Sequence, residues 1–198
     1  MHISILTLDG FNELDSLIAF SILNRVKHDN WRVSIASPNP IVTSMNGLKI
    51  HATATVADLS QADAVIIGSG TKILDATQND ALMSQIQLDG ERQLIAAQCS
   101  GALILEKLKL LNDLPVCTDL DTKPWVEALG VRVLNQPFFA SKNIATAGGC
   151  LASSYIAAWL IAKLTNTEQA TQAIYYVAPV GEKEAYVTSM LANISPFL

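Results

Sequence analysis

Charge is scarce in this sequence, and it is not gathered in one place. Lys, Arg, Asp and Glu make up 16% of the 198 residues, and the 13 basic side chains are scattered. Because a phosphate backbone is bound by clustered basic side chains, we expect no nucleic-acid partner. Long apolar runs are also missing, since the most apolar stretch, residues 155–164, is too short to span a membrane and contains Lys163. We therefore expect no membrane partner.

Cysteine and histidine are equally sparse, with three of each. Neither type recurs at the spacing of a metal site, and no glycine-rich phosphate motif follows a strand, so we expect no metal and no cofactor. An odd number of cysteines at unrelated spacings favours free thiols. Residues 1–5 lack the basic start of a signal peptide. Together these features predict a protein of the reducing cytoplasm.

Hydrophobic residues make up half of the chain, enough for a large core, and the length suits one domain spanning residues 1–198. Strand-like and helix-like segments alternate, which predicts an α/β fold with a mostly parallel sheet covered on both faces. The expected strands are residues 3–8, 31–36, 64–67, 93–98, 116–118, 131–134 and 144–146, with a short hairpin at 41–50. The expected helices are residues 14–26, 80–88, 102–110, 149–164 and 167–176.

Cys99 is the strongest candidate for chemistry. It follows an apolar strand and precedes a helical run, with small residues at Ala97 and Gly101. A nucleophile elbow needs small neighbours two residues to either side, because larger side chains would collide. We expect Cys99 to be strained and exposed, with a helix N-terminus that favours its thiolate. The alternative is a buried structural cysteine.

An acid near the first strand could assist such a thiol. Asp15 lies five residues after Gly10, early in the first predicted helix. A carboxyl beside a thiolate tends to keep its proton and can donate it. The alternative is an ordinary acidic residue at a helix N-terminus, and Glu13 competes for the catalytic role.

Three glycine-containing segments fall where other strands end. Gly68 and Gly70 could offer backbone N–H groups to a developing negative charge, and Ser100 could help through its N–H or hydroxyl. Gly149 precedes Cys150, which is either a packing residue or a second thiol whose pKa a helix start would lower. In parallel sheets ligands bind beyond the carboxyl ends of the strands, so these segments should meet at one edge.

The remaining candidates carry less information. Cys117 reads as a residue of a core strand. No histidine adjoins Cys99, so the sequence gives no support for a local Cys-His dyad.

Taken together, these motifs resemble the ThiJ/PfpI superfamily, which includes the DJ-1 proteins. The resemblance covers nearly the whole chain and lies in residues 9–15, 44–50, 63–70, 99–102 and 147–149. It implies a flavodoxin-like three-layer sandwich, related to class I glutamine amidotransferases and usually homodimeric, with the elbow cysteine close to the early acid.

The isonitrile hydratase branch is the most similar, through Asp15 and the hydroxyl residue Ser100 after the cysteine. Proteases of the superfamily carry histidine at the Ser100 position, and hydratases usually carry histidine before the residue matched by Trp125, where this chain has Pro124. The resemblance implies hydration of an isonitrile to an N-substituted formamide, with Cys99 as nucleophile and Asp15 as acid and base. Glyoxalase or deglycase chemistry on 2-oxoaldehydes is one alternative. A redox or small-molecule sensor without turnover is another.

Overall fold

The computed structural model describes residues 1–198 and is built around one six-stranded sheet. The strand order is β2-β1-β5-β6-β8-β7, and every neighbouring pair is parallel except β7 with β8. The strands are β1 (His2–Leu6), β2 (Arg32–Ala36), β5 (Ala64–Ile67), β6 (Leu94–Gln98), β7 (Phe138–Ser141) and β8 (Ile144–Ala147). The expected α/β fold, of the flavodoxin-like type with a mostly parallel sheet, is confirmed.

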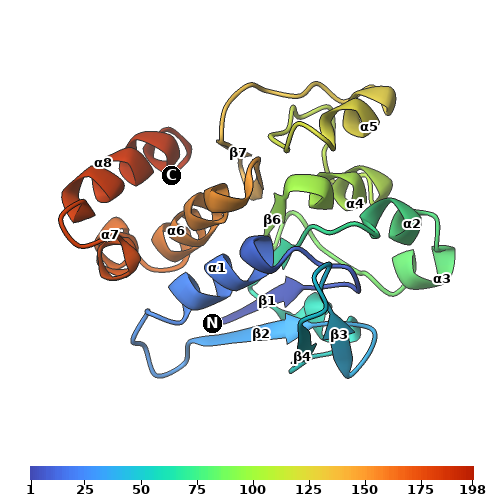
Figure 1. The fold of residues 1–198 in the computed structure, drawn as a ribbon, viewed down its shortest axis with the longest axis horizontal. Helices are drawn as coiled ribbons and strands as arrows, with labels where there is room; N and C mark the ends of the chain where they lie inside the picture. The colour runs from blue at the N-terminus through green and yellow to red at the C-terminus, as the bar shows by residue number, and fades with distance from the viewer.

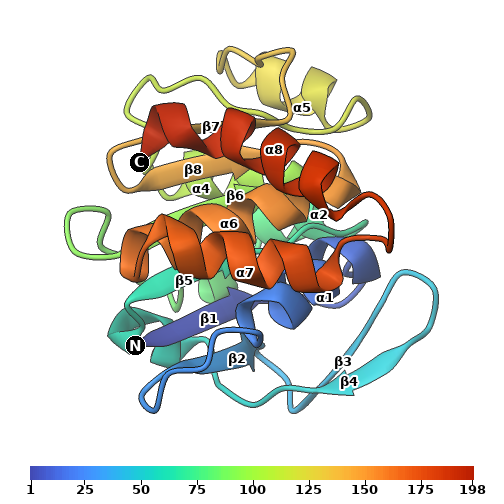
Figure 2. The ribbon, with the colours of Figure 1, turned by 90° about the vertical axis from the view of Figure 1, so that its left-hand side faces the viewer.

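Helices cover both faces of the sheet, as Figure 1 shows. One face carries α1 (Glu13–Leu23) and α6 (Ser153–Leu164), with α7 (Thr167–Val177) and α8 (Lys183–Ile194) beside them (Figure 2). The other side holds α2 (Ile73–Thr77), α3 (Asp80–Met83), α4 (Ala102–Lys107) and α5 (Lys123–Ala128). The chain also has four short 3₁₀ helices: η1 (Ala57–Gln61), η2 (Cys99–Gly101), η3 (Cys150–Ala152) and η4 (Ser195–Phe197).

The sheet divides the core into two apolar clusters, because successive strand residues point to opposite faces. On β5, Ala64 and Ile66 pack in the cluster under α1 and α6, whereas Val65 and Ile67 pack in the cluster under α4. All four are fully buried. Central strands of this kind read as continuous apolar runs, which is why their positions could be predicted.

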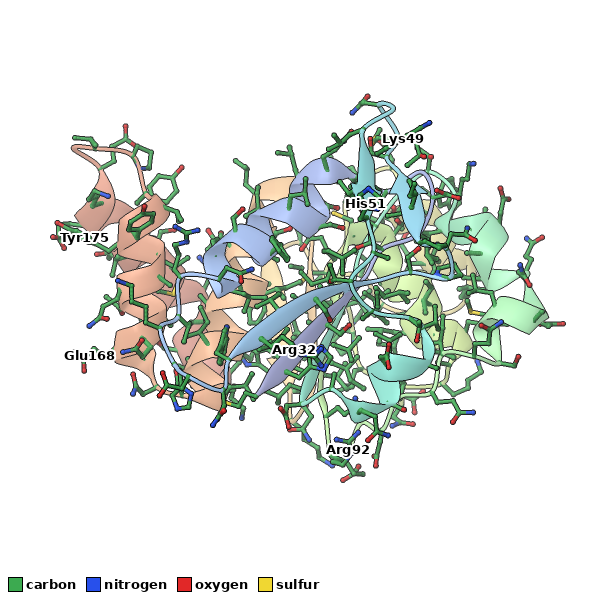
Figure 3. The ribbon with its side chains drawn as sticks, turned by 90° about the horizontal axis from the view of Figure 1, so that it is seen from below. Arg32, Lys49, His51, Arg92, Glu168 and Tyr175 are labelled. Carbon is green, nitrogen blue, oxygen red and sulfur yellow. The ribbon has the colours of Figure 1, made fainter.

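A small hairpin of β3 (Ile41–Thr43) and β4 (Lys49–His51) projects beside β2, away from the main sheet (Figures 1 and 3). Phe11, which is 1% exposed, connects it to the sheet edge. The backbone of Phe11 bridges both Ser44 on the hairpin and Gly70 after β5. The hairpin therefore forms one wall of the region beyond the carboxyl end of β1.

Several expected elements differ from the structure. Residues 116–118 and 131–134 meet only in a single bridge between Val116 and Val133, and the helix expected at 80–88 ends at Met83. The edge strand β7 and the helices α2, α5 and α8 were not expected. No helix is long and apolar enough to cross the membrane.

Candidate active site

A small cavity of about 270 Å³ lies beyond the carboxyl ends of the central strands. The sheet order reverses here, because the chain adds β2 on one side of β1 and later strands on the other. Such a reversal opens a crevice that binds ligands in doubly wound sheets. The cavity is lined by, among others, Asn12, Asp15, Ser69, Cys99, Trp125 and Cys150. The expected convergence of these separate segments at one edge is therefore present.

Cys99 is the first residue of η2, directly after β6, and its backbone is strained. Its φ is +48°, in the left-handed region that side chains with a Cβ rarely adopt. The neighbouring Gly101 has no room for a side chain, since a Cβ there would lie 2.6 Å from the carbonyl oxygen of Ile67. The strained geometry expected for an elbow is present. The expected exposure is wrong, because Cys99 is only 3% exposed.

The surroundings of the Cys99 sulfur favour the thiol over the thiolate. Burial, followed by the negative charges of Asp15 and Asp119, raises the pKa of Cys99. A hydrogen bond from the backbone N–H of Gly149 acts in the opposite direction, and Gln98 Nε2 lies 3.4 Å from the sulfur. The expectation that the helix start favours the thiolate of Cys99 is therefore wrong for the net effect of its surroundings. Desolvation outweighs the partial charge of a helix that begins as a single 3₁₀ turn.

Asp15 is completely buried in the first turn of α1. Its Oδ2 accepts a short hydrogen bond from the Ser69 hydroxyl, whereas its Oδ1 is buried without a partner. A buried carboxylate oxygen without a donor is costly, so a proton or a hydrogen-bonding ligand at this atom would stabilise the site. Ser153 Oγ donates to the Asp15 carbonyl at 3.0 Å and so links α6 to this turn.

Cys150 lies in the same cavity and is half-buried. The Asn12 side-chain amide donates to its sulfur at 3.2 Å. Burial and then Asp15 raise the pKa of Cys150, although the Asn12 hydrogen bond opposes them. The expected lowering by a helix start is therefore wrong here too. Cys150 shares with Cys99 both the cavity and the influence of Asp15.

The glycine loop after β5 is arranged differently from the expected anion site. The Gly70 N–H donates to Ser100 Oγ at 3.1 Å, so this donor already has a partner, contrary to the role expected for it. The Ser100 hydroxyl in turn donates to the Gly70 carbonyl at 3.3 Å. Gly68 serves close packing, since a Cβ there would lie 2.9 Å from both Leu6 O and Ser16 Oγ. Ser100 thus links the elbow to the loop.

The other candidate residues from the sequence, Glu13, the histidines and Cys117, do not line this cavity. Glu13 accepts hydrogen bonds from Ser44 Oγ at 2.5 Å and Asn46 Nδ2 at 2.9 Å, which attaches α1 to the hairpin. No histidine lines the cavity, and His51 lies on β4 of the hairpin (Figure 3). Cys117 is fully buried in the core. The structure contains no group of three or more His, Cys, Asp and Glu side chains able to hold a metal ion.

Three residues near the sulfurs were not found from the sequence. Asn12 caps α1 by accepting from the Leu14 N–H at 3.1 Å, and its position before an acidic helix turn was a usable signal. Gln98 donates to the Gly149 carbonyl at 2.9 Å and so joins the elbow to the late glycines. Asp119, whose Oδ1 accepts from the Thr122 N–H at 2.8 Å, belongs to an irregular loop with no sequence signal.

Comparison with protein families gives one match: residues 1–163 fit the sequence model of the DJ-1/PfpI family. A search of curated proteins finds no match. The matched range contains Asp15, Cys99 and Cys150, and ends within α6.

Solved structures share the fold at low sequence identity. A ThiJ/PfpI family protein from Pseudomonas syringae has a TM-score of 0.79 at 20% identity, covering 99% of this chain and 86% of that one. DJ-1 of Schizosaccharomyces pombe has a TM-score of 0.76 at 16% identity, covering 90% of this chain and 100% of that one. An AraC family transcriptional regulator from Pseudomonas putida has a TM-score of 0.72 at 15% identity, covering 89% and 99%.

Proposed function

This chain belongs to the DJ-1/PfpI family, and from that premise we propose that it hydrates small isonitriles to N-substituted formamides. Cys99 is the proposed nucleophile, and Asp15 is the proposed acid and base. The proposed reaction uses no cofactor, because thiol addition and proton transfer suffice for it.

The observation that carries this proposal is the pairing of a buried thiol with a buried carboxylate that has one free oxygen. Asp15 Oδ1 has no hydrogen-bond partner, and the charge of Asp15 acts directly on Cys99. An isonitrile carbon must gain a proton when a sulfur adds to it. A thiol and a carboxylate that share one proton supply both the attacking sulfur and the proton, so no histidine is needed.

The proposed first step forms a carbon–sulfur bond. The proton shared by Cys99 and Asp15 moves to the terminal carbon of the isonitrile as the sulfur attacks that carbon. The product is a thioimidate, in which carbon carries the new hydrogen and is doubly bonded to nitrogen. Asp15 is left as a carboxylate, and no proton has been exchanged with solvent.

Water completes the reaction in two further steps. The oxygen of water adds to the thioimidate carbon while Asp15 removes a proton from that water. Asp15 then delivers the proton to the nitrogen. The tetrahedral adduct then collapses, breaking the carbon–sulfur bond, and its hydroxyl proton returns to the Cys99–Asp15 pair. The Gly149 N–H, which faces the sulfur, stabilises the departing thiolate. The products are a formamide and the original thiol.

Formamide production from an alkyl isonitrile tests the proposal. Reduced wild-type protein should turn over, Cys99→Ala should not, and Cys117→Ala is the matched control because its thiol lies in the core. Turnover that persists in Cys99→Ala would refute the proposed nucleophile. A folded, reduced wild type without turnover on isonitriles of several sizes would refute the hydratase proposal, and methylglyoxal would then test the oxoaldehyde alternative.

A second candidate is binding of a small molecule without turnover. The raised pKa of Cys99 favours it, because a protonated thiol is a poor nucleophile. The Pseudomonas putida protein with the same fold is a transcriptional regulator, so a regulatory role without catalysis is worth testing. An increase in melting temperature with an isonitrile, without formamide, would favour binding over catalysis.

A further inference from the structure

The proposed hydration leaves one thiol of the cavity unused. Cys150 shares the pocket with Cys99, and both are free cysteines. From their common surroundings we propose that peroxide converts Cys99 and Cys150 into a reversible intramolecular disulfide, with Cys150 as the thiol that reacts first.

Hydrogen bonds of Gln98 link the Cys99 sulfur to the backbone segment that precedes Cys150. The side-chain amide of Gln98 contacts Cys99 Sγ at 3.4 Å and the Gly149 carbonyl at 2.9 Å. Cys150 follows Gly149 directly, so its Cα is about 3.8 Å from the Gly149 Cα. The Gly149 N–H also faces the Cys99 sulfur and lowers the pKa of Cys99. The backbone that leads into Cys150 therefore lies against the Cys99 sulfur.

Accessibility and hydrogen bonding indicate which thiol meets the oxidant. Cys150 is half-buried, whereas Cys99 is 3% exposed. The Asn12 amide donates to the Cys150 sulfur at 3.2 Å, and this contact offsets part of the rise in the pKa of Cys150 that burial and Asp15 cause. We therefore expect oxidation to begin at Cys150, which is the more accessible of the two thiols and is not used in the proposed hydration.

The chemistry balances with hydrogen peroxide as the oxidant. The Cys150 thiolate attacks one peroxide oxygen, which gives a sulfenic acid and releases hydroxide. Cys99 then attacks the Cys150 sulfur, Asp15 accepts the Cys99 proton, and that proton leaves with the sulfenic hydroxyl as water. Two thiols are oxidised and one peroxide is reduced. A dithiol restores both thiols by exchange.

Intact mass spectrometry under non-reducing conditions tests this without any measurement of turnover. After mild hydrogen peroxide the wild type should lose about 2 Da, and digestion should yield one cross-linked pair of peptides containing Cys99 and Cys150. Dithiothreitol should reverse the change. Cys117→Ser should behave like the wild type.

Two single variants separate the steps. In Cys99→Ser, Cys150 should accumulate as a sulfenic acid that reacts with dimedone. In Cys150→Ser, the Cys99 thiol should survive a dose that oxidises the wild type, with folding of each variant checked by melting temperature. The proposal fails if peroxide forms no disulfide in the wild type and instead adds about 32 Da to Cys99, as a sulfinic acid, to the same extent in the wild type and in Cys150→Ser. A disulfide that joins two chains would also overturn it.

Discussion

At the scale of single residues, the unpartnered oxygen of Asp15 is the clearest mark of chemistry. Asp15→Asn keeps the size of the side chain but cannot accept a proton, so formamide formation should fall by about 10²–10⁴-fold. Glu13→Gln is the matched control, since Glu13 bonds the hairpin and not the thiols, and it should lose less than about tenfold. Equal losses in the two variants, both folded, would contradict the role assigned to Asp15.

The sequence predicted the positions of these residues better than their protonation. Cys99 and Asp15 were found because strand ends of a parallel sheet converge and because small residues flank an elbow. Their burial was not predictable from local sequence, since segments distant along the chain, such as those of Ser69 and Trp125, line the same cavity. Burial destabilises the thiolate, and on Cys99 this effect outweighs the lowering of the pKa that a helix start was expected to cause.

At the scale of elements, the elbow packs against the neighbouring strand through a glycine. Gly101→Ala would place a Cβ 2.6 Å from the Ile67 carbonyl oxygen, so the turn or β5 must move. We expect a loss of about 1–3 kcal/mol in the free energy of unfolding, measured with denaturant. Gly90→Ala is the control, because its nearest atoms lie at 3.6 Å, an ordinary contact. Equal stabilities for the two variants would disprove this packing argument.

Elements were predicted well where burial imposes a clear pattern and poorly elsewhere. β5 was found at its observed bounds because its four residues are apolar and buried. The edge strand β7 has alternating burial and a polar end at Ser141, so it gave no comparable signal. The helix α8 buries only Val187, Met190 and Ile194, and this narrow stripe was missed.

At the scale of the whole molecule, thiols buried in the folded state link stability to alkaline pH. Burial raises the pKa of Cys117 to about 12 in the folded protein, from an ordinary value of 9.0. Between pH 9 and pH 12 the folded protein therefore keeps the Cys117 proton, whereas the unfolded chain releases it. The unfolded state thus binds fewer protons in this range. The stabilisation is fully present below pH 9 and is lost as pH rises towards 12.

Cys117→Ala isolates this effect from all other titrations. The variant lacks the proton linkage, so the free energy of unfolding of the wild type should fall relative to that of the variant by about 1.4 kcal/mol per pH unit above pH 9. Denaturant unfolding at pH 8, 9.5 and 10.5 under reducing conditions measures the difference. A gap between the two proteins that stays constant over this range would mean that Cys117 ionises equally well in the folded and unfolded states.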